Sequence, residues 1–92
     1  MNDKTTGRYM YSQNDIADMT LSSDYKIRFK GEYLELQNRI NKLYTMLVKY
    51  QADELDYIPD TPINVLQEQF NAMQKYKYWL DVRCKIEHIN IY

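Results

Sequence analysis

The sequence predicts an all-α fold: an antiparallel two-helix hairpin preceded by a short helix. Two long stretches, residues 24–50 and 62–88, repeat hydrophobic residues at helical spacing. The 92 residues include only two glycines and two prolines, so little interrupts a helix. A connector of about ten residues, longer than a minimal helix connector, joins the two stretches. Because a chain of this size buries a thin core, we expect the hairpin to oligomerise through helix packing.

The N-terminal region, residues 1–23, is predicted to form an arm and a short helix, and residues 24–92 the hairpin domain. Residues 1–11 lack helical periodicity, which is typical of a flexible arm. Ser12 and Asp15 have the spacing of a capping pair, so the short helix should run from there to about Met19.

The first long helix should begin close to Ser23, whose hydroxyl and that of Ser22 are good N-caps, with Asp24 in the first turn. Gly31 lies in the helix interior, where it either admits another backbone or is tolerated on the solvent side; we expect the second. The hydrophobic positions form a heptad seam that needs a partner helix, and they are Phe29, Tyr33, Leu36, Ile40, Leu43, Leu47 and Tyr50.

Thr61 is expected to cap the second long helix, with Pro62 at its first position. This helix has two hydrophobic edges, whereas a hairpin needs one. The second edge is expected to contact either the short N-terminal helix or another subunit. The first edge contains Leu66, Phe70, Met73 and Leu80, and the second contains Val65, Ala72, Tyr76, Trp79 and Ile86.

Composition and motifs argue against an enzyme. No phosphate-binding loop, dinucleotide fingerprint or metal-ligand cluster is present, so we expect no catalytic residues, no cofactor and no metal. The net charge of −1 argues against a partner that is an extended nucleic acid. Cys84 is the only cysteine, which favours a reducing cytoplasm, and no hydrophobic run or signal-like segment indicates a membrane.

Charge is distributed unevenly along the chain. Residues 24–52 carry six basic and three acidic side chains, and residues 53–60 carry four acids and no base. In an antiparallel hairpin the cations at the start of the first helix lie beside those at the end of the second. Cations in a first helical turn oppose the helix dipole, and an anionic partner would relieve that cost.

We therefore predict an anion or nucleotide site at this end, with tyrosines that can stack on a base. Two alternatives remain open: a solvated charged face, or docking of the basic end onto the acidic loop of a neighbouring subunit. The predicted site residues are Arg8, Tyr9, Tyr11, Lys26, Arg28, Lys30, Arg83 and Lys85.

The hairpin resembles a family of very small tailed-phage proteins named after an uncharacterised crAssphage gene product. The resemblance rests on matches through both long helices, among them Arg28-Phe29, Glu32-Tyr33, Lys42-Leu43, Met46-Leu47 and Lys49-Tyr50 in the first, and Pro62-Ile63, Leu66, Gln69, Ala72-Met73, Tyr76, Leu80, Arg83 and Ile86-Glu87 in the second. It implies a helical hairpin encoded among accessory phage genes, without known catalytic residues.

From this resemblance we expect a phage-encoded, non-enzymatic counter-defence protein acting in the bacterial host cytoplasm. The preferred mechanism is a sponge that sequesters a nucleotide-type immune signal such as a cyclic nucleotide, by analogy with small oligomeric phage sponges. One alternative is an inhibitor that binds a host defence protein such as a CRISPR nuclease. The other is a structural oligomerisation module.

Overall fold

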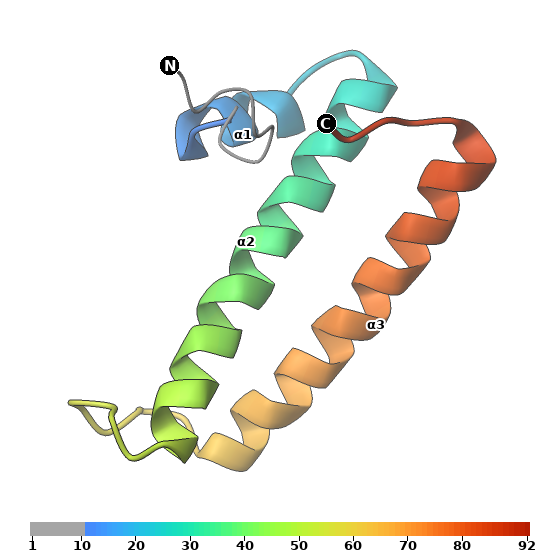
Figure 1. Ribbon diagram of the computed structural model, residues 1–92. Coiled ribbons are helices and arrows are strands. Elements are labelled where there is room, and N and C mark those ends of the chain that lie inside the picture. Colours follow the sequence, from blue (N-terminus) through green and yellow to red (C-terminus); the bar gives the residue numbers. More distant parts are fainter. Residues whose placement is uncertain (1–10) are drawn as a thin grey trace, which may run out of the picture.

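The computed structural model describes residues 11–92, which form three helices and no strand (Figure 1). The helices are α1 (Gln13–Thr20), α2 (Tyr25–Gln51) and α3 (Ile63–Glu87). α2 and α3 run antiparallel, and α1 packs on the N-terminal half of α2. The predicted all-helical hairpin is therefore confirmed. The predictions for the arm, including Arg8 and Tyr9, lie outside the described residues.

Local hydrogen bonds set where the first two helices begin. The Ser12 hydroxyl accepts from the Asp15 amide at 3.1 Å, and the Asp15 carboxylate accepts from the Ser12 amide at 3.0 Å, which is the predicted capping box. Asp24 is itself the N-cap of α2, because its carboxylate accepts from the amides of Lys26 and Ile27. α2 thus starts at Tyr25, two residues after Ser23, which is within the predicted range.

The ends of α3 differ in part from the sequence prediction. Pro62 occupies the N-cap position and no side chain caps the helix, so the expected cap by Thr61 is wrong. At the other end His88 adopts a left-handed conformation with φ 56°, and the Ile89 amide donates to the Cys84 carbonyl at 3.0 Å. The chain then turns back across the end of the hairpin toward α1 (Figure 1).

The buried core is concentrated at the end of the hairpin that α1 and this tail cover. Leu80 of α3 and Phe29 of α2 are the most buried side chains, with 1% and 3% of their surface exposed. The other buried members are Tyr33, Leu36 and Ile40 from the predicted seam, Ile16 from the apolar side of the predicted short helix, and Leu34, Ile89 and Ile91, which the sequence analysis did not place in the core.

Toward the connector the hairpin has only two layers, and its packing residues are half-buried. These residues are Leu43, Leu47, Leu66, Phe70 and Met73. Tyr76 and Trp79, which were assigned to helix packing or oligomerisation, are exposed.

A polar group also joins α2 to α3. The Tyr33 hydroxyl donates to the Asp81 carboxylate at 2.6 Å, and Lys77 lies 3.2 Å from the same carboxylate. The Lys77 ammonium is 5.2 Å from the centre of the Tyr33 ring, within range of a cation–π interaction. Desolvation and the bond to Asp81 raise the pKa of Tyr33. These contacts fix the register between the two helices about a third of the way along α2.

Gly31 is the point at which α1 and α2 approach most closely. A Cβ atom at this position would lie 2.8 Å from the Thr20 nitrogen and 3.0 Å from the Met19 carbonyl carbon. Both are main-chain atoms of α1, so neither can move without shifting the helix. The expectation that Gly31 is tolerated on the solvent side is therefore wrong, because its missing side chain makes room for α1.

We predict that Gly31→Ala destabilises the protein by about 1–3 kcal/mol, the usual cost of inserting a carbon atom into a packed site. Chemical denaturation monitored by circular dichroism measures this. Asn41→Ala, on an exposed turn of the same helix, serves as the control. If Gly31 faced solvent, the substitution would instead raise the free energy of unfolding by about 1 kcal/mol, because alanine favours a helix more than glycine does.

Candidate functional site

The structure brings part of the predicted anion site together at the end of the hairpin. Arg28 of α2 and Arg83 of α3 line one cavity of about 330 Å³. We call it the basic cavity; its other lining residues are Thr20, Tyr25, Phe29 and Glu32. It therefore combines two guanidinium groups with two aromatic rings.

Arg83 is held in place by three side chains. Its Nε donates to Glu87 at 3.0 Å and its Nη2 donates to the Tyr25 hydroxyl, which in turn donates to Glu87 at 2.6 Å. The guanidinium carbon lies 4.7 Å from the centre of the Phe29 ring. Arg83 is thus pre-oriented, and Glu87 neutralises part of its charge.

Sequence reasoning missed Glu87 as a site residue. The signal was available, because Glu87 follows Arg83 by four residues on a helix, a spacing at which opposite charges pair.

Arg28 has a structural role in the same cavity. Its Nη1 donates to the carbonyl oxygens of Ser22 and Ser23 at 3.0 and 3.1 Å, so it closes the turn between α1 and α2. The Arg28 guanidinium lies 5.9 Å from the Tyr25 ring centre. Within residues 11–92, the other predicted cations, Lys26, Lys30 and Lys85, form no ion pair.

The hydrogen bonds of this cluster change the acidity of its members. Donation from the Tyr25 hydroxyl, and then from Arg83, lowers the pKa of Glu87 below its usual 4.5. The same bond to Glu87 raises the pKa of Tyr25 above 10.0. Glu87 is therefore a carboxylate, and Tyr25 a neutral phenol, throughout the physiological range.

Tyr11 lines a different cavity, between α1, α2 and the C-terminal tail. This cavity of about 510 Å³ is called the amide cavity, because four of its lining residues carry carboxamides. Asn38, one of them, follows Arg28 by ten residues, or roughly 15 Å along α2. The structure therefore does not bring Tyr11 to the predicted cations. The lining residues are Tyr11, Gln13, Ile16, Leu34, Gln37, Asn38, Asn41 and Tyr92.

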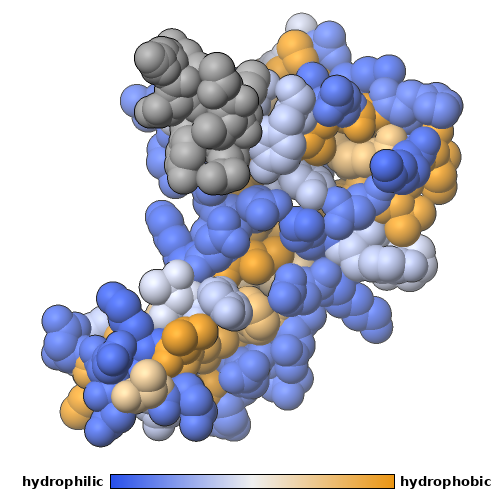
Figure 2. All heavy atoms as spheres, in the orientation of Figure 1, coloured by the Kyte–Doolittle hydropathy of each residue, from blue (hydrophilic) through white to orange (hydrophobic). Residues whose placement is uncertain are grey.

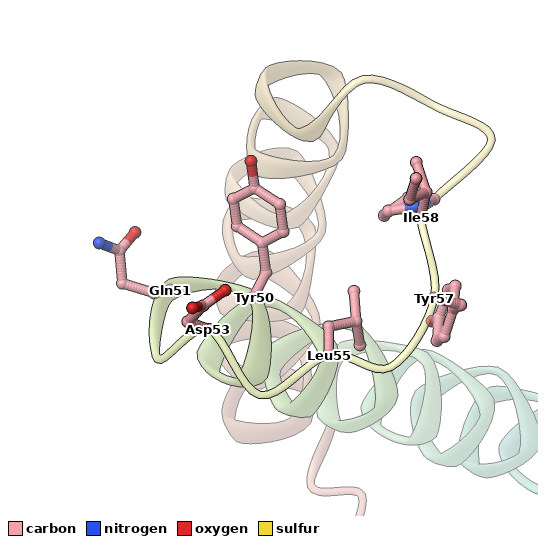
Figure 3. Close-up of a pocket in the computed structure, with 7 residues that line it drawn as sticks. Tyr50, Gln51, Asp53, Leu55, Tyr57 and Ile58 are labelled. Atoms are coloured by element: carbon pink, nitrogen blue, oxygen red, sulfur yellow. The ribbon is translucent and has the colours of Figure 1, made fainter.

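A further cavity, of about 600 Å³, lies within the connector at the opposite end of the hairpin (Figure 3). Tyr50, Leu55 and Ile58 surround the hollow that the connector encloses, while Gln51 points away from it. Ile58 is 91% exposed. Asp53 is the only charged lining residue, so this cavity does not suit an anion.

Hydrophobic side chains also lie on the surface of α3, away from α2. Figure 2 shows such side chains over the C-terminal half of this helix. Val65, Ala72, Trp79 and Ile86 are spaced seven residues apart and are all exposed, as is the neighbouring Tyr76. We call these five residues the outer row. Seven-residue spacing is that of a helix that packs against another helix.

Two further kinds of site, a reactive thiol and a metal centre, can be checked in residues 11–92. Burial raises the pKa of the Cys84 thiol, which disfavours the reactive thiolate. Histidine, cysteine and carboxylate side chains of this part of the chain form no group that could hold a metal ion. Of the three described helices, none has a hydrophobic segment long enough to cross a membrane.

Comparison with known proteins finds one family. A family model described as Sequestin matches residues 23–86, which is 64 of the 92 residues. The match covers α2, the connector and nearly all of α3, and it leaves out α1 and the C-terminal tail. No curated protein and no solved structure matches the chain.

We predict that the Glu87 carboxyl titrates below pH 4.5 and that Tyr25→Phe moves its titration upward, because the variant loses the hydroxyl that donates to the carboxylate. Carbon-detected NMR of the side-chain carboxyl measures both values. Since folding lowers this pKa, the associated stability is present above the unfolded pKa and is lost as pH falls through the folded one. Tyr78→Phe, on the surface of α3, is the control, and equal midpoints in all three proteins would contradict the prediction.

Proposed function

Because the chain belongs to the Sequestin family, we propose that the protein is a non-enzymatic binding protein that sequesters a phosphate-bearing nucleotide ligand at the basic cavity. The family name is consistent with a sequestering protein. The observation that carries the finer proposal is the position of Arg83, 4.7 Å from the Phe29 ring and bonded to Tyr25. In this cavity the Arg83 guanidinium can bind the phosphate of a nucleotide, and the ring of Tyr25, which is 46% exposed, can stack on its base.

The hydrogen bonds around Arg83 leave donors for a ligand. A guanidinium has five N–H groups, and Glu87 and Tyr25 accept from its Nε and Nη2 atoms. The remaining N–H groups can donate to a phosphate while the existing bonds hold the guanidinium in place. Lys26 and Lys30 lie on the same end of α2 without ion pairs in the described part of the chain, and they add attraction for an anion.

In its biological setting, the protein would be a phage-encoded counter-defence factor in the bacterial cytoplasm. There it would lower the free concentration of a cyclic nucleotide immune signal. The resemblance of both long helices to small tailed-phage proteins supports this setting, and the family match supports sequestration. Stoichiometric capture needs no catalytic group.

We predict that Lys26→Ala combined with Arg28→Ala weakens binding of a cyclic nucleotide by at least about ten-fold, because each lost charge-assisted hydrogen bond contributes about 1.5–3 kcal/mol. Thermal shift with a panel of cyclic di- and oligonucleotides first identifies the ligand, since binding to the folded state raises the melting temperature. Lys42→Ala with Lys49→Ala removes the same charge nearer the connector and should leave affinity unchanged. If the two double variants bind the cyclic nucleotide with equal affinity, the basic cavity is not its binding site.

The outer row of α3 supports self-association as part of this function. A two-fold axis between Lys75 and Tyr76 would place Val65 opposite the partner's Ile86, and the small Ala72 opposite the partner's Trp79. This antiparallel arrangement also brings the acidic connector of each copy toward the basic end of the other. Size complementarity and opposite charge therefore both favour a second copy as the occupant of this surface.

We predict that light scattering of the wild type gives twice the 11.2 kDa mass of one chain. In the Trp79→Glu variant the measured mass should fall to that of a single chain. The substitution buries a charge in the centre of the proposed interface. Gln74→Glu, on the other side of the same helix, adds the same charge and should leave the dimer intact. A monomeric wild type would contradict self-association and would favour a host protein as the partner of the outer row.

A further inference from the structure

The lining of the amide cavity is that of a second binding site, separate from the basic cavity. Its floor consists of Ile16 and Leu34, which are 5% and 6% exposed. Its walls carry the carboxamides of Gln13, Gln37, Asn38 and Asn41, and two tyrosine rings, Tyr11 and Tyr92, complete it. A hydrophobic floor with polar walls is the usual construction of a small-molecule site, and about 510 Å³ is within the usual size.

The four carboxamides are available to a ligand as far as the described residues are concerned. Within residues 11–92 none of these side chains makes a hydrogen bond to another side chain or to the main chain. Gln37 and Asn38 are half-buried, so they are only partly solvated by water. A ligand with matching donors and acceptors would therefore gain hydrogen bonds at a modest cost in desolvation.

The chemistry of the lining selects the class of ligand. No lining residue is an aspartate, glutamate, lysine, arginine or histidine, so the side chains of the cavity provide no cation for a phosphate. A carboxamide presents a donor and an acceptor side by side in one plane, and this pattern pairs with the edge of a nucleobase. Tyrosine rings stack on the face of any base. A planar, uncharged heterocycle with hydrogen-bonding edges satisfies every part of the site.

We infer that the amide cavity binds a nucleobase, lying on Ile16 and Leu34 and hydrogen-bonded at its edge by Asn38 and the neighbouring carboxamides. The inference deepens the proposed function and rests on it, since it adds a second base site roughly 15 Å along α2 from the basic cavity. Four of the eight lining residues, Tyr11, Gln13, Ile16 and Tyr92, lie outside the segment that matches the family model. Half of the lining thus lies outside the family segment, whereas the carboxamides of Gln37, Asn38 and Asn41 lie inside it.

The test is a two-dimensional ¹H–¹⁵N NMR titration of the full 92-residue chain with adenosine, guanosine, cytidine and uridine in turn. Ribose 5-phosphate, which has the sugar and phosphate without the base, is the fifth probe. We expect at least one nucleoside to shift the side-chain NH₂ signals of Asn38 and Asn41 to saturation. We expect ribose 5-phosphate to leave these two signals in place.

Asn38→Leu keeps the side-chain volume close to that of asparagine and removes its hydrogen-bonding groups, so it should weaken nucleoside binding by about ten-fold. Asn41→Leu, at a more exposed wall of the cavity, should do the same without affecting the fold. Asn71→Leu, on the exposed surface of α3, is the matched control and should bind as the wild type does. Wild-type affinity in both cavity variants would overturn the inference.

The outcomes separate this inference from the proposed function. If no nucleoside shifts the Asn38 and Asn41 signals, or if ribose 5-phosphate shifts them equally, the amide cavity is not a base site, even where a cyclic nucleotide binds at the basic cavity. If nucleosides bind at Asn38 and no cyclic nucleotide raises the melting temperature, the base site stands and the proposed sequestration fails.

Discussion

The close main-chain contact between α1 and α2 at Gly31 determines where both candidate cavities form. A side chain at this position would collide with the backbone at Thr20, so only glycine lets α1 lie so close to α2. The C-terminal end of α1 then contributes Thr20 to the basic cavity, and its N-terminal end contributes Gln13 and Ile16 to the amide cavity. The short helix thus separates a charged site from an uncharged one along the same long helix.

Charge at this end of the hairpin is balanced in a way that suits reversible binding of an anion. Asp24 caps α2 and offsets the positive end of its dipole, and Glu87 pairs with Arg83. An Arg83 without these partners would move among many rotamers, and ordering it would cost conformational entropy on binding. Because Glu87 and Tyr25 already order Arg83 in the free protein, binding does not need to restrict its rotamers further.

Much of the fold could be predicted from the sequence, because the long helices depend on periodicity and on local caps. The bounds of α2 and α3 agree with the heptad pattern to within a residue, and the Ser12–Asp15 capping box is a purely local signal. Apart from the local cap expected at Thr61, what failed depends on tertiary contacts. Gly31 and Leu34 belong to a second packing face of α2 that faces α1, and a seven-residue repeat does not show it. Ile89 and Ile91 are buried only because the chain turns back at His88.

The candidate site was predictable only in part for the same reason. Arg28 and Arg83 meet because antiparallel helices place their opposite ends together. Tyr11 lies elsewhere because it precedes α1, whose N-terminal end lies beside residues 37–41 of α2. The central claim is sequestration, and recovery of the ligand after binding tests it most directly. The full chain is mixed with a cyclic nucleotide, separated from free ligand, and denatured to release what it holds. The account predicts that the released nucleotide is chemically intact and stoichiometric with the protein; a converted product, or no retained nucleotide across the panel, would contradict it.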